Sequence, residues 1–326
     1  MIDLTGLVKG TNAYKIIESD KRAGKLSHAY LILCQDGENL NSYLKEIVKL
    51  LFCISSSPCG ECRACSLIEN GVHPDAVFLP KKGDAVLSED ISGLIQDTFI
   101  KPYESDKKVF VINHGETMNA QSQNKLLKTL EEPPKNVHII IGATSEYALL
   151  PTIKSRVKQI VIHPFDYNTL FNALKNQCSD HEKLSDAINY SDGTLSKTLA
   201  LYNDENFTET FDFCLELLTN MKSSSDVLEY SYKLDKLKSD FRDFLSVLEV
   251  LLRDVLVGLD NQNLIINKNK MPQIKALTGY KRGALLAILD DVLLATKRLE
   301  ANSSKNAVGE WLLFKILEEK FKWQKL

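Results

Sequence analysis

Short apolar runs alternate with segments of helical periodicity along the first half of the chain, and this alternation restricts the fold most. The helical segments carry apolar residues three and four positions apart, as in residues 41–53. Strands that alternate with helices usually pair in parallel, because each helix carries the chain back to the same edge of the sheet. We therefore predict an α/β core with a mainly parallel sheet covered by helices. The runs expected as strands are 29–33, 75–80, 107–113, 136–144 and 158–164.

Two further helices are expected between these strands. Residues 88–103 have Ser88 as a candidate N-cap, and their apolar spacing turns Phe99 inward. Residues 119–134 end at two prolines, and a proline disfavours helical geometry in the residue before it.

After residue 164 the strand pattern stops. Residues 165–206 indicate short helices, and residues 207–326 indicate longer ones. The chain of 326 residues is long enough for two or three domains. We expect a core over residues 1–164, a small helical domain over 165–206 and an all-α domain over 207–326.

Charge and hydropathy exclude several classes of protein. The formal net charge is −3, which disfavours a uniformly basic nucleic-acid binder. The first 22 residues show no signal-peptide pattern, and no apolar run reaches the length of a membrane span. We expect a cytoplasmic protein with no membrane partner.

The first strand–helix junction lacks the residues of a phosphate-binding loop. A working loop has the pattern GxxxxGK[ST], in which glycine amides and the lysine hold phosphate and the hydroxyl holds Mg²⁺. Here Cys34 and Asn39 stand in place of the two glycines, Leu40 in place of the lysine and Asn41 in place of the hydroxyl residue.

The strand at 107–113 lacks the acidic pair that would manage Mg²⁺ and water. It ends in Asn113 and His114, and neutral asparagine is a poor substitute for a carboxylate beside Mg²⁺. We therefore predict that the chain binds no ATP. A generic α/β sheet unrelated to nucleotide binding would explain the same residues.

Four cysteines, Cys53, Cys59, Cys62 and Cys65, interrupt the core within thirteen residues. Zn²⁺ takes four thiolates in tetrahedral geometry, and the C-x2-C spacing suits it. All four positions of such a site are filled, so we predict a structural zinc module over residues 53–65.

Three alternatives to that zinc site are possible from the sequence. Disulfides are disfavoured in a cytoplasmic chain. An iron–sulfur cluster is a serious alternative. The usual cysteine pattern of such clusters continues C-x3-C-P, however, whereas here the fourth cysteine lies upstream. His73 could replace one ligand, but its position favours the start of the next strand.

The segment NKLLKTLEEPPKNVHIIIGATSEYALLPTIKSRVKQI, residues 124–160, strongly resembles the AAA+ clamp-loader family. The strand SHAYLIL, the four cysteines and HPD at 73–75 add to this resemblance, which is specific over about residues 10–165. It implies an AAA+ type core, a helical lid over 165–206 and a helical collar over 207–326 that oligomerises. It also implies a non-hydrolysing subunit that works with ATPase subunits and the delta subunit to place a sliding clamp on primed DNA.

The same resemblance implies a role for Arg156, with Ser155 setting the local turn. A guanidinium at this place can act as an arginine finger on a neighbour's ATP. Val157 departs from the family's SRC motif, and Ser196 stands where active members carry an arginine. The ordinary alternative for Arg156 is a surface arginine at a helix end.

Two other functions remain open from the sequence. One is an active clamp-loader ATPase. Leu40 and Asn113 argue against it, because they stand where such an ATPase has a lysine and a carboxylate. The other is a stand-alone zinc-containing nucleic-acid-binding protein, which would bind DNA in a salt-sensitive manner.

Overall fold

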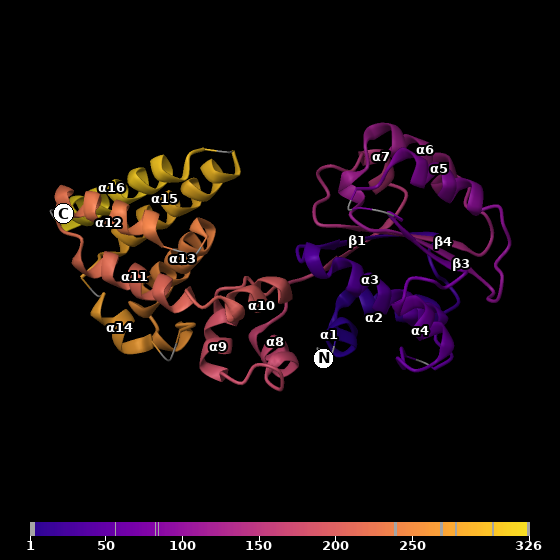
Figure 1. Ribbon diagram of the computed structural model, residues 1–326, viewed down its shortest axis with the longest axis horizontal. Coiled ribbons are helices and arrows are strands. Elements are labelled where there is room, and N and C mark those ends of the chain that lie inside the picture. Colours follow the sequence, from indigo (N-terminus) through magenta and orange to yellow (C-terminus); the bar gives the residue numbers. More distant parts are fainter. Residues whose placement is uncertain are drawn as a thin grey trace. The chain divides into compact units, whose positions relative to one another are not determined.

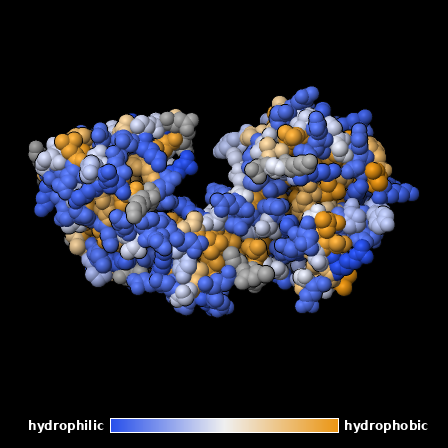
Figure 2. All heavy atoms as spheres, viewed as in Figure 1, coloured by the Kyte–Doolittle hydropathy of each residue, from blue (hydrophilic) through white to orange (hydrophobic). Residues whose placement is uncertain are grey.

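The computed structural model describes residues 4–55, 57–81, 83, 85–237, 240–267, 270–277, 279–301 and 303–324. The chain forms two compact units. The first is Met1–Ser179 with Gly193–Ser196, and the second is Asp180–Asp192 with Lys197–Leu326. The division predicted at residues 164 and 206 stays a prediction. Hydrophilic side chains cover most of the visible surface of each unit (Figure 2).

The first unit is built on a five-stranded sheet in the order β2-β3-β4-β1-β5 (Figure 1). Every described strand pair is parallel, which confirms the predicted α/β core. The central strands are almost wholly buried, as expected for a sheet covered on both faces. The strands are β1 (Ala29–Cys34), β2 (Ala76–Leu79), β3 (Lys108–Ile112), β4 (Val137–Ala143) and β5 (Lys158–Ile162).

Alternate residues of each strand feed two different cores. In β1, Tyr30 and Ile32 pack with one group of helices, and Ala29 and Leu31 with the other. Figure 1 shows these two groups on opposite faces of the sheet. On one face lie α1 (Leu4–Gly10), α2 (Asn12–Arg22), α3 (Gly37–Phe52) and α4 (Arg63–Glu69); on the other lie α5 (Ser88–Asp97), α6 (Ala120–Glu131) and α7 (Pro151–Lys154). The first unit also contains η1 (Gly115–Thr117) and α8 (Tyr167–Leu174).

Two expectations about α5 are wrong. Ser88 is the first helical residue, and the N-cap is Leu87, whose N–H donates to the Asp90 carboxylate at 3.0 Å. Phe99 is 77% exposed instead of buried, because the helix ends at Asp97 and the chain turns before Phe99. The apolar spacing alone did not show where the helix ends.

The second unit is helical and is organised around one continuous hydrophobic core. Within the described residues no helix is both long enough and apolar enough to cross a membrane. The elements are α9 (His181–Asn189), α10 (Leu195–Asn203, whose first two residues belong to the first unit), α11 (Phe207–Asn220), α12 (Ser224–Lys236), α13 (Phe241–Gly258), η2 (Gln262–Leu264), α14 (Met271–Ala276), α15 (Arg282–Glu300) and α16 (Lys305–Gln324).

Candidate functional site

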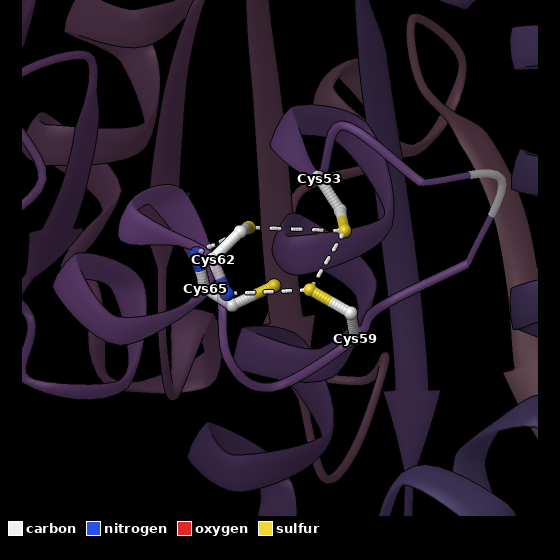
Figure 3. A group of neighbouring side chains, drawn as sticks. All are labelled: Cys53, Cys59, Cys62 and Cys65. Carbon is white, nitrogen blue, oxygen red and sulfur yellow. Dashed lines mark hydrogen bonds between the residues drawn. The ribbon is translucent and has the colours of Figure 1, made fainter.

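The four cysteines of the module at 53–65 converge (Figure 3). Their Sγ atoms all lie within 4.8 Å of one another. The Sγ atom of Cys53 is 3.6 Å from that of Cys59 and 3.9 Å from that of Cys62. A tetrahedral ion with Zn–S bonds of about 2.3 Å would separate its sulfurs by about 3.8 Å. The group therefore has the dimensions of a four-thiolate metal site such as that of zinc.

Local backbone structure aims these sulfurs. Cys53 directly follows the end of α3, and Gly60 has a φ of +76°, which lets the chain turn tightly. Cys62 is the N-cap of α4 and accepts a hydrogen bond from the N–H of Cys65 at 3.5 Å. Cys59 accepts one from the N–H of Cys62 at 3.3 Å. N–H donors directed at sulfur favour the thiolate that a metal requires.

The pKa values of the thiols differ across the module. Donation from the N–H of Cys62 lowers the pKa of Cys59 to about 6. Burial raises the pKa of Cys65 to about 12, because a buried thiolate lacks solvation. A cation at the centre of the group would favour the charged form of every member. Four protein ligands leave no open position, so the site suits a structural role.

His73 is not a member of this group. Its Nδ1 accepts a hydrogen bond from the N–H of Asp75 at 3.1 Å. Its ring lies 4.6 Å, centroid to centroid, from the ring of Phe52. Burial lowers the pKa of His73, which favours the neutral ring. His73 thus packs beside the module, and the sequence-based alternative of a histidine ligand finds no support.

Sequence reasoning missed the role of Asp75, which is 1% exposed. Its carboxylate accepts hydrogen bonds from the N–H groups of Tyr103, Glu104 and Ser105 at 2.6, 2.9 and 2.9 Å. The Ser105 hydroxyl donates a fourth bond at 2.6 Å. Asp75 therefore holds the chain between α5 and β3. No local pattern could reveal this, because the donors lie about thirty positions away.

The junction between β1 and α3 is closed. Leu40, which stands where a phosphate loop has its lysine, is fully buried and faces Gly142 of β4. A cavity of about 10 Å³ lies beside the junction, lined by Asp36 and by residues from 162–165 and 193–194. That volume holds about one water molecule and no phosphate chain.

The end of β3 carries an acidic residue that sequence reasoning missed. Glu116 accepts a hydrogen bond from the Thr144 hydroxyl at 2.7 Å, and its carboxylate lies 3.3 Å from Nδ1 of His114. His114 and Thr144 also lie against Gly37, the first residue of α3. Asn113 and His114 follow β3 as expected, and a carboxylate lies beside them. Its position three residues past Asn113 matched no known pattern.

Arg156 lies at the opposite edge of the sheet. It lies two residues before β5, and its carbonyl accepts a hydrogen bond from Nε2 of His28, which precedes β1, at 3.1 Å. Asp36 and His114 instead follow their strands. Parallel strands place these groups on different edges, and strands of six or seven residues separate the edges by about 20 Å. Arg156 therefore cannot reach the junction between β1 and α3 of its own chain.

The Arg156 guanidinium has partners at this edge. It forms an ion pair with Glu131 at 2.7 Å and donates to the Thr152 carbonyl at 3.1 Å and the Ser155 hydroxyl at 3.2 Å. Its side chain is 35% exposed, and that of Glu131 is 49% exposed. Val157 beside it is buried in the sheet core. Sequence reasoning did not foresee the Glu131 partner, which belongs to the LEEPP segment that ends α6.

Comparison with known proteins assigns this arrangement to a class. Residues 9–166 match the family described as "DNA polymerase III, delta subunit". The delta' subunit of DNA polymerase III from Bacillus subtilis (strain 168) is 27% identical over 316 residues, which cover 94% of this chain and 94% of that protein. The delta' subunit from Yersinia pestis is 30% identical over 148 residues, 44% of each chain. The chain is of the class of DNA polymerase III subunits.

Solved structures resemble the chain more distantly. A gamma subunit-related protein of DNA polymerase III from Thermotoga maritima is 21% identical, with 93% of this chain and 99% of that chain covered and a TM-score of 0.44. That likeness is too distant to carry a functional conclusion. The sequence matches are more informative: the chain is similar to delta' subunits of DNA polymerase III, over nearly its whole length in the case of the Bacillus subtilis protein. The family predicted from residues 124–160 is confirmed.

Substitution of Asp75 tests how much its hydrogen bonds stabilise the fold beside the four-cysteine module. Asp75→Ala should lower the free energy of unfolding at pH 7 by about 3 kcal/mol, because it leaves buried backbone donors without an acceptor. Burial alone would raise the pKa of Asp75, but its hydrogen bonds outweigh burial and lower that pKa. The stability that the carboxylate contributes is therefore present above its unfolded pKa and is lost as pH falls through its folded pKa.

Urea denaturation between pH 3 and pH 7 would measure this contribution. Asp106→Ala is the matched control, because its side chain lies in the same loop and is 82% exposed. The control should change stability by less than about 0.5 kcal/mol. Equal stabilities of Asp75→Ala and the control at pH 7 would contradict the assignment.

Proposed function

We propose that the chain is a non-catalytic subunit of the replicative clamp loader. It assembles with ATPase subunits and the delta subunit and helps to place the sliding clamp on primed DNA. Its own contribution is Arg156, an arginine finger that it supplies to the ATP site of a neighbouring subunit. One observation supports this most: the partly exposed guanidinium lies at one edge of the sheet, and the filled junction between β1 and α3 lies at the other.

Three features argue against ATP hydrolysis by this chain. Leu40 is buried where a lysine would meet phosphate, and the adjoining cavity of about 10 Å³ has no room for a phosphate chain. The carboxylate of Asp36 at this junction would repel phosphate oxygens. Glu116 supplies one acidic group, but phosphoryl transfer also needs groups that cradle the phosphates. An active ATPase is therefore the weaker reading.

The chemistry of the finger follows from the guanidinium. It is planar, always charged and able to donate two parallel hydrogen bonds to phosphate oxygens. Charge develops on the γ-phosphoryl oxygens as the bond to the β-phosphate breaks, and a guanidinium there stabilises the transition state. Ser155 accepts a hydrogen bond from the same group and so helps to orient it.

The last two helices carry an apolar stripe that suits assembly. Gly283 near the start of α15 contacts Trp323 near the end of α16, so these helices run antiparallel. Exposed apolar side chains recur seven positions apart on each helix, and the antiparallel register puts them at similar levels along the pair. They are Leu286 (48% exposed), Leu293 (47%), Phe314 (46%) and Phe321 (40%). We propose that the helices of a neighbouring subunit cover this stripe.

The four-cysteine group holds Zn²⁺ in this proposal. Its sulfur separations fit tetrahedral zinc, and the four thiolates fill the coordination sphere. The ion would tie the end of α3 to the start of α4, in addition to the apolar contacts of Ile68. It would take no part in chemistry, because no ligand position remains for water.

The zinc assignment predicts one tightly bound Zn²⁺ per chain. Cys62→Ser should lose the ion and loosen residues 53–69, because metal binding and local folding are coupled. Elemental analysis of the dialysed protein and hydrogen exchange of that segment measure the two effects. Cys178→Ser, which changes a buried cysteine outside the group, is the control and should keep the ion. Iron instead of zinc, or no metal in the unaltered protein, would overturn the assignment.

The finger predicts a defect that appears only in the assembled complex. Arg156→Ala should leave folding and assembly intact and should reduce ATP hydrolysis at the one site it serves by about 10³–10⁵-fold. Total hydrolysis should fall less, because other sites keep their own fingers, and clamp loading should fall further. Arg156→Lys should be nearly as harmful, because an ammonium lacks the planar fork.

The measurement compares reconstituted complexes in ATP hydrolysis and clamp loading. Arg22→Ala is the matched control, because Arg22 is an exposed arginine of the same unit that pairs only with its helical neighbour Glu18 among the described ion pairs. The control should behave as the unaltered chain. Wild-type clamp loading by both Arg156 variants would show that Arg156 is an ordinary surface residue.

The stripe predicts a defect in assembly. Leu293→Glu combined with Phe314→Glu should weaken incorporation into the complex by tenfold or more, because two charges would be buried in an apolar contact. Size-exclusion chromatography across a concentration series measures this. Leu264→Glu is the control, since Leu264 is 58% exposed and lies in η2, outside the stripe. Unchanged assembly of the double variant would reject the stripe as an interface.

A further inference from the structure

The carboxylate of Asp36 is buried at the place where a phosphate loop would face its ligand. Asp36 lies between β1 and α3 and is 3% exposed. In nucleotide-binding α/β proteins the backbone N–H groups at such a place attract a phosphate anion. A buried charge is costly unless donors satisfy it. The hydrogen-bond donors around Asp36 therefore indicate which parts of the chain its carboxylate connects.

Five hydrogen bonds converge on this one carboxylate. Its Oδ2 accepts from the N–H groups of Leu195 and Ser196 at 3.0 and 3.3 Å and from the Tyr43 hydroxyl at 2.8 Å. The side-chain amide of Asn39 lies 3.1 and 3.2 Å from its two oxygens. Asp36 takes part in none of the described ion pairs, so neutral donors alone stabilise its charge.

Two of these donors are the first N–H groups of α10. The first N–H groups of a helix have no partner inside the helix, and the helix dipole favours an anion beside them. Leu195 and Ser196 therefore bind the Asp36 carboxylate as a helix start binds phosphate. The carboxylate reaches them across some 160 positions of sequence, so it joins the junction between β1 and α3 to the start of α10.

A second contact fixes the position of residues 193–196. The carbonyl of Gly193 accepts a hydrogen bond from the N–H of Phe165, which follows β5, at 2.8 Å. Gly193 has a φ of +75°, and a Cβ added there would lie 2.6 Å from the Phe165 carbonyl oxygen. Only glycine fits without displacing the neighbouring backbone. Residues 193–196 are thus held from two sides, with room for about one water molecule between them.

We propose that Asp36 is a built-in anion that replaces phosphate at this site and permanently joins the loop after β1 to the start of α10. A phosphate would make this connection only while a nucleotide is bound. The carboxylate makes it at all times, so the arrangement of residues 193–196 does not depend on ATP. The inference rests on the proposed function in one respect, that this chain works without bound ATP.

Hydrogen exchange at the amides of Leu195 and Ser196 tests the proposal in the unaltered chain. First-turn amides of a helix ordinarily exchange fast, whereas these two should be protected at least tenfold relative to unstructured peptide. Addition of Mg²⁺-ATP should leave their protection unchanged. Exchange at the unprotected rate, or protection that appears only with ATP, would overturn the proposal without the use of any variant.

Removal of the charge gives a second measurement. Asp36→Asn keeps the shape of the side chain and removes its charge. It should speed exchange of both amides at least tenfold, because an NH₂ group in place of a carboxylate oxygen cannot accept their hydrogen bonds. Asp90→Asn is the matched control, since Asp90 also accepts a backbone N–H at a helix start but belongs to α5. It should leave residues 193–196 unchanged. Equal exchange in Asp36→Asn and the control contradicts the proposal.

Chemical rescue identifies the carboxylate itself as the missing group. Asp36→Gly removes a fragment equivalent to acetate and leaves its donors in place. Acetate should restore protection to Leu195 and Ser196 in this variant, whereas chloride at the same ionic strength should not. Equal effects of the two salts would reject a specific anion site. The proposed finger could fail in the reconstituted complex while these results hold, because Arg156 is not involved.

Discussion

The parallel pairing of all five strands is the constraint on which the first unit depends. Parallel strands send every segment that follows a strand to one edge of the sheet and every segment that precedes one to the other. Asp36, His114 and Thr144 therefore gather at the carboxyl edge, whereas Arg156 lies at the amino edge. Such a sheet gathers groups that contact one another within the chain at one edge. It leaves groups at the other edge in a position where they can contact a neighbouring subunit.

The carboxyl edge has the geometry of an anion site, and its donors are occupied within the chain. Helix starts and strand ends converge there, and the N–H groups of Leu195 and Ser196 are directed at a negative charge. The charge is a carboxylate of the same chain, and Leu40 fills the adjoining space with an apolar side chain. On such a backbone arrangement, a few side chains decide what binds the start of α10. It can be a phosphate that binds reversibly, or a carboxylate of the chain that is always present.

The sequence predicted those features that arise from local patterns. Apolar runs located the strands, and the spacing of Cys53, Cys59, Cys62 and Cys65 located the four-cysteine group, because both are encoded within a few neighbouring positions. Long-range hydrogen bonds escaped prediction. Asp36 and Asp75 find their donors about 160 and 30 positions away, and nothing beside them in sequence marks those donors. Phe99 was misplaced because apolar spacing does not reveal that the helix ends at Asp97.

The pairing of Arg156 with Glu131 explains how one guanidinium can be both ordered and available. Both side chains are partly exposed, and an exposed ion pair contributes about 0–1 kcal/mol to stability. Exchange of Glu131 for phosphate oxygens, as the proposed finger requires, would therefore cost little, and the new partner would carry more charge than the old one. The bonds to Thr152 and Ser155 meanwhile keep the side chain at the amino edge instead of leaving it free in solvent. A weak internal partner thus limits the conformations of the proposed finger and would not compete strongly with the ATP of a neighbouring subunit.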